Sequence, residues 1–167
     1  MNKALVGSTV ALLLAGSTVA FASPASAEER TCRGTIGAVT LDNVRVPEGA
    51  LCRLEGTRLQ GTLKIEEGGR LVAVGTRIIG NVQGEGHQRV VVRNSRVGGS
   101  IQLVQGEAAV LRRNTVNQDV QSFENGAAQT FTGNTIDGNL QCKENRPAPT
   151  GGNNTVGGNK EDQCAGL

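Results

Sequence analysis

The chain has 167 residues and a formal net charge of +2, with no Trp, no Tyr and only three Phe. Its core must therefore be built from Val, Ile, Leu and Ala, in a chain of single-domain size. Excluding Lys3, the 17 basic residues become 16, against 15 acidic ones. This near-neutral balance argues against nonspecific binding of nucleic acid or acidic lipid.

Residues 1–27 have the features of a signal peptide. Lys3 is followed by the small or apolar stretch 4–22, then by Pro24 and by the small residues Ala25-Ser26-Ala27. This pattern predicts cleavage after Ala27 and export of residues 28–167 as one domain. A retained membrane anchor is disfavoured because Gly, Ser and Thr interrupt the apolar run, whereas a spanning helix needs about 20 predominantly apolar residues. We expect no membrane span after cleavage.

Beyond the leader, apolar residues recur every 19 to 20 positions. One apolar column comprises Leu59, Ile78, Val97, Val116, Ile136 and Val156. A second comprises Val44, Leu63, Val82, Ile101, Val120 and Leu140. Near these positions apolar and polar residues alternate, as in Leu63-Lys64-Ile65, which is the period of a β-strand.

The repeat predicts an all-β chain folded as a single-stranded parallel β-helix, or β-solenoid. Dividing the 140 residues of 28–167 by this period gives about seven coils. Each coil adds about 4.8 Å along the axis, the distance between paired strands. Glycines such as Gly61, Gly80 and Gly99 recur at one phase and indicate a corner. A β-sandwich is the alternative, but it would not preserve one phase over five or six repeats.

Polar residues also repeat in phase. One polar column comprises Thr57, Thr76, Ser95, Asn114, Asn134 and Asn154. Another comprises Lys64, Gln83, Gln102, Gln121 and Gln141. Stacked amides can hydrogen-bond from coil to coil, so we interpret both columns as structural.

Four cysteines in an exported chain indicate two disulfides. Cys32 and Cys52 lie one repeat apart near the start, and Cys142 and Cys164 lie about one repeat apart near the end. Stacked residues would be about 4.8 Å apart, within the Cα range of about 4.4–6.8 Å that a disulfide needs. The sequence therefore predicts the bonds Cys32–Cys52 and Cys142–Cys164, each fastening a terminal coil.

Two sequence segments carry a resemblance to known proteins. The repeat unit Ile78-Ile79-Gly80-Asn81-Val82-Gln83 resembles those of bactofilins and related right-handed bacterial β-solenoids. The ending, 138–145 with 157–164, is similar to uncharacterised exported proteins of actinobacteria. The resemblance implies a right-handed coil. Bactofilins are cytosolic polymers without disulfides, and this chain differs from them in its leader and its cysteine pairs.

The acidic residues do not form an enzymatic pattern. Many parallel β-helices resemble polysaccharide lyases and hydrolases, which need carboxylates that converge on one face. Here Asp119 and Asp137 each share a column with neutral residues, and Glu66-Glu67 stands alone near a turn. His87 is the only His, and the sequence places it in a surface loop. We therefore expect no enzyme, no metal site and no cofactor.

One outward column is charged. Arg58, Arg77 and Arg96 share a phase in three consecutive repeats, where like charges repel each other. Two interpretations are open: pairing with neighbouring Glu side chains, which we favour, or contact with an acidic cell-wall or extracellular polymer. The same phase continues as Thr residues at 115, 135 and 155, but an ice-binding face would need paired Thr columns.

These features predict a secreted, non-enzymatic protein with a structural or interaction role at the cell envelope or outside the cell. A binding module for an anionic polymer, using the Arg58, Arg77 and Arg96 column, is the main alternative. A polysaccharide lyase or hydrolase is a weaker one. Partners other than such a polymer or a second copy of the chain are not indicated by the sequence, and nucleic acid is not expected.

Overall fold

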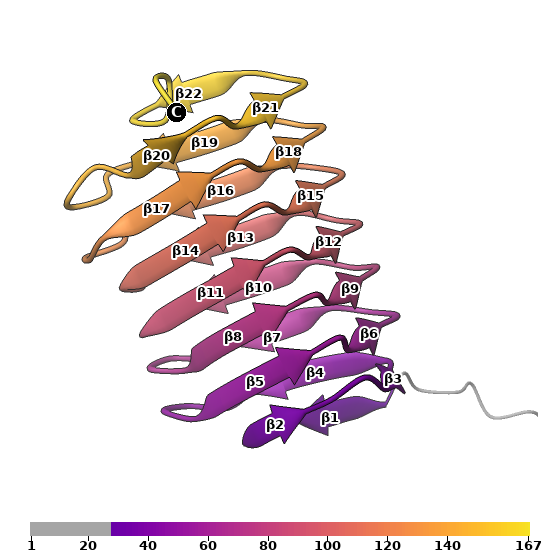
Figure 1. Ribbon diagram of the computed structural model, residues 1–167. Helices are drawn as coiled ribbons and strands as arrows, with labels where there is room; N and C mark the ends of the chain where they lie inside the picture. Colours follow the sequence, from indigo (N-terminus) through magenta and orange to yellow (C-terminus); the bar gives the residue numbers. More distant parts are fainter. Residues whose placement is uncertain (1–27) are drawn as a thin grey trace, which may run out of the picture.

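A computed structural model describes residues 28–167, and the signal peptide predicted for 1–27 lies outside the described residues. The described chain is all-β, with strands in three parallel sheets that enclose a common interior (Figure 1). The predicted β-solenoid of about seven coils is confirmed. Each coil takes one strand from each sheet in turn, from coil 1 (β1, β2, β3) to coil 7 (β19, β20, β21), and β22 begins a further turn.

The three sheets, which we name A, B and C, differ in strand length. Sheet A contains β1 (Glu29–Thr31), β4 (Asn43–Val46), β7 (Leu63–Ile65), β10 (Val82–Glu85), β13 (Ile101–Val104), β16 (Val120–Phe123), β19 (Leu140–Lys143) and β22 (Lys160–Asp162). Sheet B contains β2 (Gly34–Ile36), β5 (Leu51–Glu55), β8 (Arg70–Val74), β11 (Arg89–Arg93), β14 (Ala108–Arg112), β17 (Gln129–Thr132) and β20 (Thr150–Gly152). Sheet C contains β3 (Thr40–Leu41), β6 (Arg58–Leu59), β9 (Arg77–Ile78), β12 (Arg96–Val97), β15 (Thr115–Val116), β18 (Thr135–Ile136) and β21 (Thr155–Val156).

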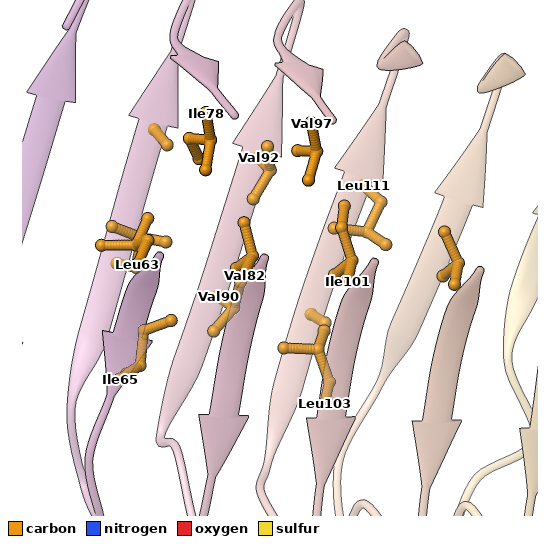
Figure 2. Close-up of a cluster of buried hydrophobic side chains, with 14 of the residues drawn as sticks. Leu63, Ile65, Ile78, Val82, Val90, Val92, Val97, Ile101, Leu103 and Leu111 are labelled. Atoms are coloured by element: carbon orange, nitrogen blue, oxygen red, sulfur yellow. The ribbon is translucent and has the colours of Figure 1, made fainter. Parts of the chain in front are cut away.

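The apolar columns predicted from the repeat line the interior. Leu63 pairs with Val82, and Val82 pairs with Ile101, in the parallel register that the repeat requires. All three side chains are fully buried, and Figure 2 shows them in succession along the interior. Leu59 and Ile78 pair in the same way in sheet C. The strand alternation therefore places one apolar set inside and leaves the opposite set of positions to the surface.

Hydrogen-bonded ladders of short polar side chains hold the corners. At the corner between sheets B and C, the Asn114 backbone N–H donates to Asn134 Oδ1 (3.0 Å). Asn134 in turn donates its backbone N–H to Asn154 Oδ1 and its side-chain amide to the Leu111 carbonyl, at 3.0 and 2.9 Å. The corner between sheets C and A has a similar ladder, in which Asn139 donates its backbone N–H to Asp119 Oδ1 (2.7 Å). The predicted structural role of the stacked Asn residues is confirmed.

Both predicted disulfides are formed, but their geometry differs from the predicted stacking. Cys52 pairs with Gly34 in sheet B, whereas Cys32 follows β1 and donates its backbone N–H to the Arg45 carbonyl in sheet A. The Cys32–Cys52 bond therefore joins two sheets across the interior, with a Cα–Cα distance of 5.5 Å. The Cys142–Cys164 bond spans 5.3 Å between Cα atoms and fastens the turn that follows β22.

The predicted surface position of His87 is wrong. Its side chain is fully buried at the corner between sheets A and B. A Cβ atom on Gly106 would collide with the imidazole, and one on Gly84 would lie 3.1 Å from its Nδ1. The ring therefore occupies space that these two glycines leave open in the interior.

Candidate anion-binding surface

The predicted arginine column lies on the outer face of sheet C. Arg58 pairs with Arg77, and Arg77 with Arg96, in β6, β9 and β12. All three arginines are exposed, while the next residue in each strand is buried. Because each of these strands has only two residues, one side chain points inward and the other must point outward.

The ion pairs that we favoured for this column are not formed. Within residues 28–167, no carboxylate lies within ion-pair distance of Arg58, Arg77 or Arg96. Arg45, on sheet A, shows the contrasting case: it contacts Glu29 at 2.8 Å and Glu66 at 3.3 Å. The hydrogen bond from Arg45 to Glu29 and the charge of Glu66 raise the pKa of its guanidinium. The pairing interpretation of the column was therefore wrong.

A second group of arginines, which the repeat analysis missed, lies on the outer face of sheet B. These exposed residues are Arg53, Arg70, Arg89, Arg93 and Arg112. Arg70 pairs with Arg89, and Arg93 pairs with Arg112. The sequence did contain a signal, because β11 reads Arg-Val-Val-Val-Arg and its two ends share one face of the sheet.

A column of valines separates these arginines. Val72, Val91 and Val110 pair in register at the outward position in the middle of each strand. Val91 is only 4% exposed although it faces outward, so neighbouring side chains must cover it. Arg89 and Arg93 flank it on the same face, and long arginine stems commonly pack over apolar surface while the charged group stays in water. The low exposure of Val91 agrees with arginine stems that lie over the valine column.

Together with Arg113 at the corner between sheets B and C, these residues form what we call the arginine surface. Its members are Arg53, Arg58, Arg70, Arg77, Arg89, Arg93, Arg96, Arg112 and Arg113. None of them has a carboxylate within 4.0 Å in the described chain. The lysines Lys64, Lys143 and Lys160 all belong to sheet A strands. Among the outward strand positions of sheets B and C, Glu55 is the one acidic residue within 28–167.

A shallow hollow lies within the arginine surface, on sheet C. Arg58 and Arg77 line it together with Thr40, Gln60 and Ile79, and its volume is about 220 Å³. The Ile79 side chain is 52% exposed at this site. Two cationic groups, two polar side chains and the apolar Ile79 therefore surround a space that is open to solvent.

The outer face of sheet A has a different chemistry. Gln83 donates its side-chain amide to Gln102 (3.1 Å), Gln102 donates to Gln121 (3.0 Å), and the chain of amides continues to Gln141. Gln83, Gln102 and Gln121 line an open groove of about 500 Å³, together with the partly exposed Phe123. The amides are engaged with one another, which confirms the structural role predicted for this column.

The described residues contain no cluster of three or more His, Cys, Asp or Glu side chains that could hold a metal ion. Asp119, one of the acids considered for catalysis, accepts a hydrogen bond within a corner ladder. No helix of the length and apolarity needed to cross a membrane occurs between residues 28 and 167.

Comparisons with known proteins returned no match: no family model, no curated protein and no solved structure resembles the chain significantly. The chain is therefore characterised by its architecture, a seven-coil parallel β-solenoid with two disulfides and one arginine-rich side.

Proposed function

We propose that this chain is an exported, non-enzymatic binding module whose arginine surface binds a linear anionic polymer outside the cell. The observation that carries the proposal is the gathering of nine exposed arginines, eight on two adjacent sheets and one at the corner between them, with no carboxylate partner among the described residues. Like charges held one coil apart repel each other, and an anionic ligand would relieve that repulsion.

The fold supports this role because it holds the charges at fixed positions. Every strand of the arginine surface pairs with neighbours on both sides, so its backbone is not free to rearrange. A binding surface that is already ordered loses less conformational entropy when its ligand binds. A clustered positive face also accelerates the approach of an anionic partner, although the chain as a whole is nearly neutral.

The proposed extracellular setting rests on two further features. Two disulfides are typical of an oxidising compartment, and residues 1–27 have the pattern of a signal peptide. The sequence resemblance of 138–145 and 157–164 to exported actinobacterial proteins agrees with a solenoid that works at or beyond the cell envelope.

The proposal is tested by removing charge from one face at a time. The variant Arg58→Gln/Arg77→Gln/Arg96→Gln removes three charges from sheet C. Its matched control, Lys64→Gln/Lys143→Gln/Lys160→Gln, removes three from sheet A. Binding to isolated cell-wall fractions and to polygalacturonate is measured over a salt series. We expect the arginine variant to bind at least about tenfold more weakly at low salt and with a shallower salt dependence.

The lysine control should bind nearly as well as the wild type. Equal losses in the two variants would mean that net charge, rather than the arginine surface, governs binding. Unchanged binding by the arginine variant would refute a role for the sheet C column.

A further inference from the structure

We propose that the anion-binding surface is centred on the corner between sheets B and C, with Arg113 as its anchoring residue. The ligand would be a linear polymer of carboxylate or phosphate groups that lies along the solenoid axis over this corner. This inference rests on the proposed function and goes further, because it assigns the centre of the site, the direction of the ligand and the type of anion.

The backbone at this corner takes a left-handed conformation in coil after coil. Residues with positive φ at this position are Gly56, Gly75, Asn94, Arg113, Gly133 and Asn153. Glycine and asparagine are the residues that adopt this conformation most readily. Arg113, with φ of 55°, is the exception. Non-glycine residues with positive φ also occur at the corner between sheets A and B, among them Gln105, so Arg113 is distinguished by its charge and by its place between the two groups of arginines.

The corner holds Arg113 firmly in that conformation. Its backbone N–H donates to the Thr132 carbonyl (3.0 Å). The next residue, Asn114, is buried in the corner ladder and donates its side-chain amide to the Val92 carbonyl (2.8 Å). The exposed Arg113 side chain is therefore presented outward from a fixed backbone, between the arginines of sheet B and those of sheet C.

The distribution of the arginines along the axis indicates how a ligand would lie. Each of coils 2 to 5 contributes two or three arginines to the surface, whereas coils 6 and 7 contribute none. Four successive coils span three steps of about 4.8 Å, or roughly 14 Å, along the axis. Arg93 and Arg112 lie on one side of the corner, and Arg77 and Arg96 lie on the other. Two cationic rows on either side of an edge fit an extended chain that runs parallel to that edge.

The choice of residue indicates the type of anion. All nine cations of the surface are arginines, and the three lysines of residues 28–167 lie on sheet A. The planar guanidinium can donate two parallel hydrogen bonds to one carboxylate or phosphate group, whereas the lysine ammonium acts as a point charge. The surface is therefore suited to anions that offer two equivalent oxygens.

The first test separates strain from binding. Arg113→Gly should raise the thermal midpoint of the full mature chain, because glycine adopts the positive φ without strain. It should also weaken binding to polygalacturonate or to linear polyphosphate at least about threefold, because the anchoring guanidinium is lost. Gln105→Gly is the matched control: Gln105 has a φ of 51° in the same coil, at the corner between sheets A and B, and is uncharged. We expect it to raise the thermal midpoint without changing binding.

The second test keeps the positive charge and removes the guanidinium group, which can donate two parallel hydrogen bonds to one anion. Arg93→Lys/Arg112→Lys/Arg113→Lys should bind severalfold more weakly with the salt dependence of the wild type. Affinity equal to that of the wild type would overturn the assignment of the anion type. The polygalacturonate and polyphosphate arms show whether carboxylate or phosphate is preferred, and inorganic phosphate alone should bind far more weakly than the polymer.

Failure of this inference can be told apart from failure of the proposed function. Suppose that the sheet C variant loses binding while Arg113→Gly and Arg93→Lys/Arg112→Lys/Arg113→Lys do not. The corner is then not the centre of the site, and the proposed function stands. If the wild-type chain binds neither polymer nor cell-wall fractions, both proposals are overturned.

Discussion

Coils 2 to 5 and coils 6 to 7 share one interior but present different outer surfaces. Val97 in coil 4 and Ile136 in coil 6 are both buried in sheet C. On the outer face of that sheet, the column begins at Thr40, holds arginine in coils 2 to 4 and continues as exposed or partly exposed Thr115, Thr135 and Thr155. The same outward position therefore holds arginine in some coils and threonine in others without a change of register. An outer position that the fold does not constrain can be shaped by function, which is why the arginine block is informative.

The two regions also differ inside, at the corner between sheets A and B. In coils 6 and 7, Asn125 and Asn145 form a ladder, in which Asn145 Oδ1 accepts the Asn125 backbone N–H (3.1 Å). In the preceding coils, the chain between strands of sheets A and B carries His87 and Gly106. Neither ring nitrogen of His87 makes a hydrogen bond of normal geometry within the described chain. At this corner, a buried imidazole without hydrogen-bond partners in coil 4 is followed by hydrogen-bonded asparagines in coils 6 and 7.

The largest expected loss of stability comes from asparagine substitutions in the ladder at the corner between sheets B and C. Comparing one substitution from each region tests whether the two interiors are equivalent. Asn114→Ala lies in the arginine-bearing half, and Asn134→Ala lies in the threonine-bearing half. Each substitution leaves a buried N–H and a buried carbonyl without their side-chain partner. We expect each to lower the free energy of unfolding by about 2–3 kcal/mol. Urea denaturation measures the loss.

The exposed Asn117→Ala serves as a control for these ladder variants, with an expected change within about 0.5 kcal/mol. A large loss from only one of the two ladder variants would show that the halves of the solenoid are not equivalent inside.

A smaller effect is expected from the titration of His87. Burial lowers the pKa of this imidazole, and the nearby Gly84 backbone opposes the shift in part. Above pH of about 6.5 the side chain is neutral in both the folded and the unfolded chain. As the pH falls below that value, the unfolded chain binds a proton that the folded chain resists, so stability should decrease.

The measurement is the urea midpoint between pH 7.5 and 5. His87→Leu removes the titrating group and should make the midpoint less dependent on pH in this range. A wild-type midpoint that stays constant down to pH 5 would contradict a neutral, buried His87.

The smallest effect on stability is expected from extending the arginine column. Thr115→Arg/Thr135→Arg/Thr155→Arg changes only outward positions, so each substitution should alter the free energy of unfolding by no more than about 0.5 kcal/mol. Binding to polygalacturonate should become tighter, with a salt dependence steeper by roughly one released ion per added arginine. Isothermal titration over a salt series checks both. Unchanged binding would mean that the site does not extend along the axis beyond coil 4 of sheet C.

Much of the fold could be predicted from the sequence because a solenoid repeats its environment. Leu59, Ile78 and Val97 recur at a constant interval, and a constant interval means the same position in successive coils. The register, the inward columns and the arginine column on sheet C all follow from this one period. The cysteine pairing was also predicted from it, although Cys32 and Cys52 do not stack as the period implies. Each of these features depends only on a residue's position within the repeat, and the sequence spacing shows that position directly.

Other features depended on how the columns are arranged around the coil. The repeat does not show that Cys52 stacks on Gly34 while Cys32 stands in another sheet. Nor does it show that glycines in adjacent coils open a space for His87. Sheet B brings its arginines next to those of sheet C only because the backbone turns at the left-handed corner that includes Arg113. The sequence by itself determined which residues stack along the axis, whereas the tertiary structure decided which stacks are neighbours, because the corners set the path of the backbone around each coil.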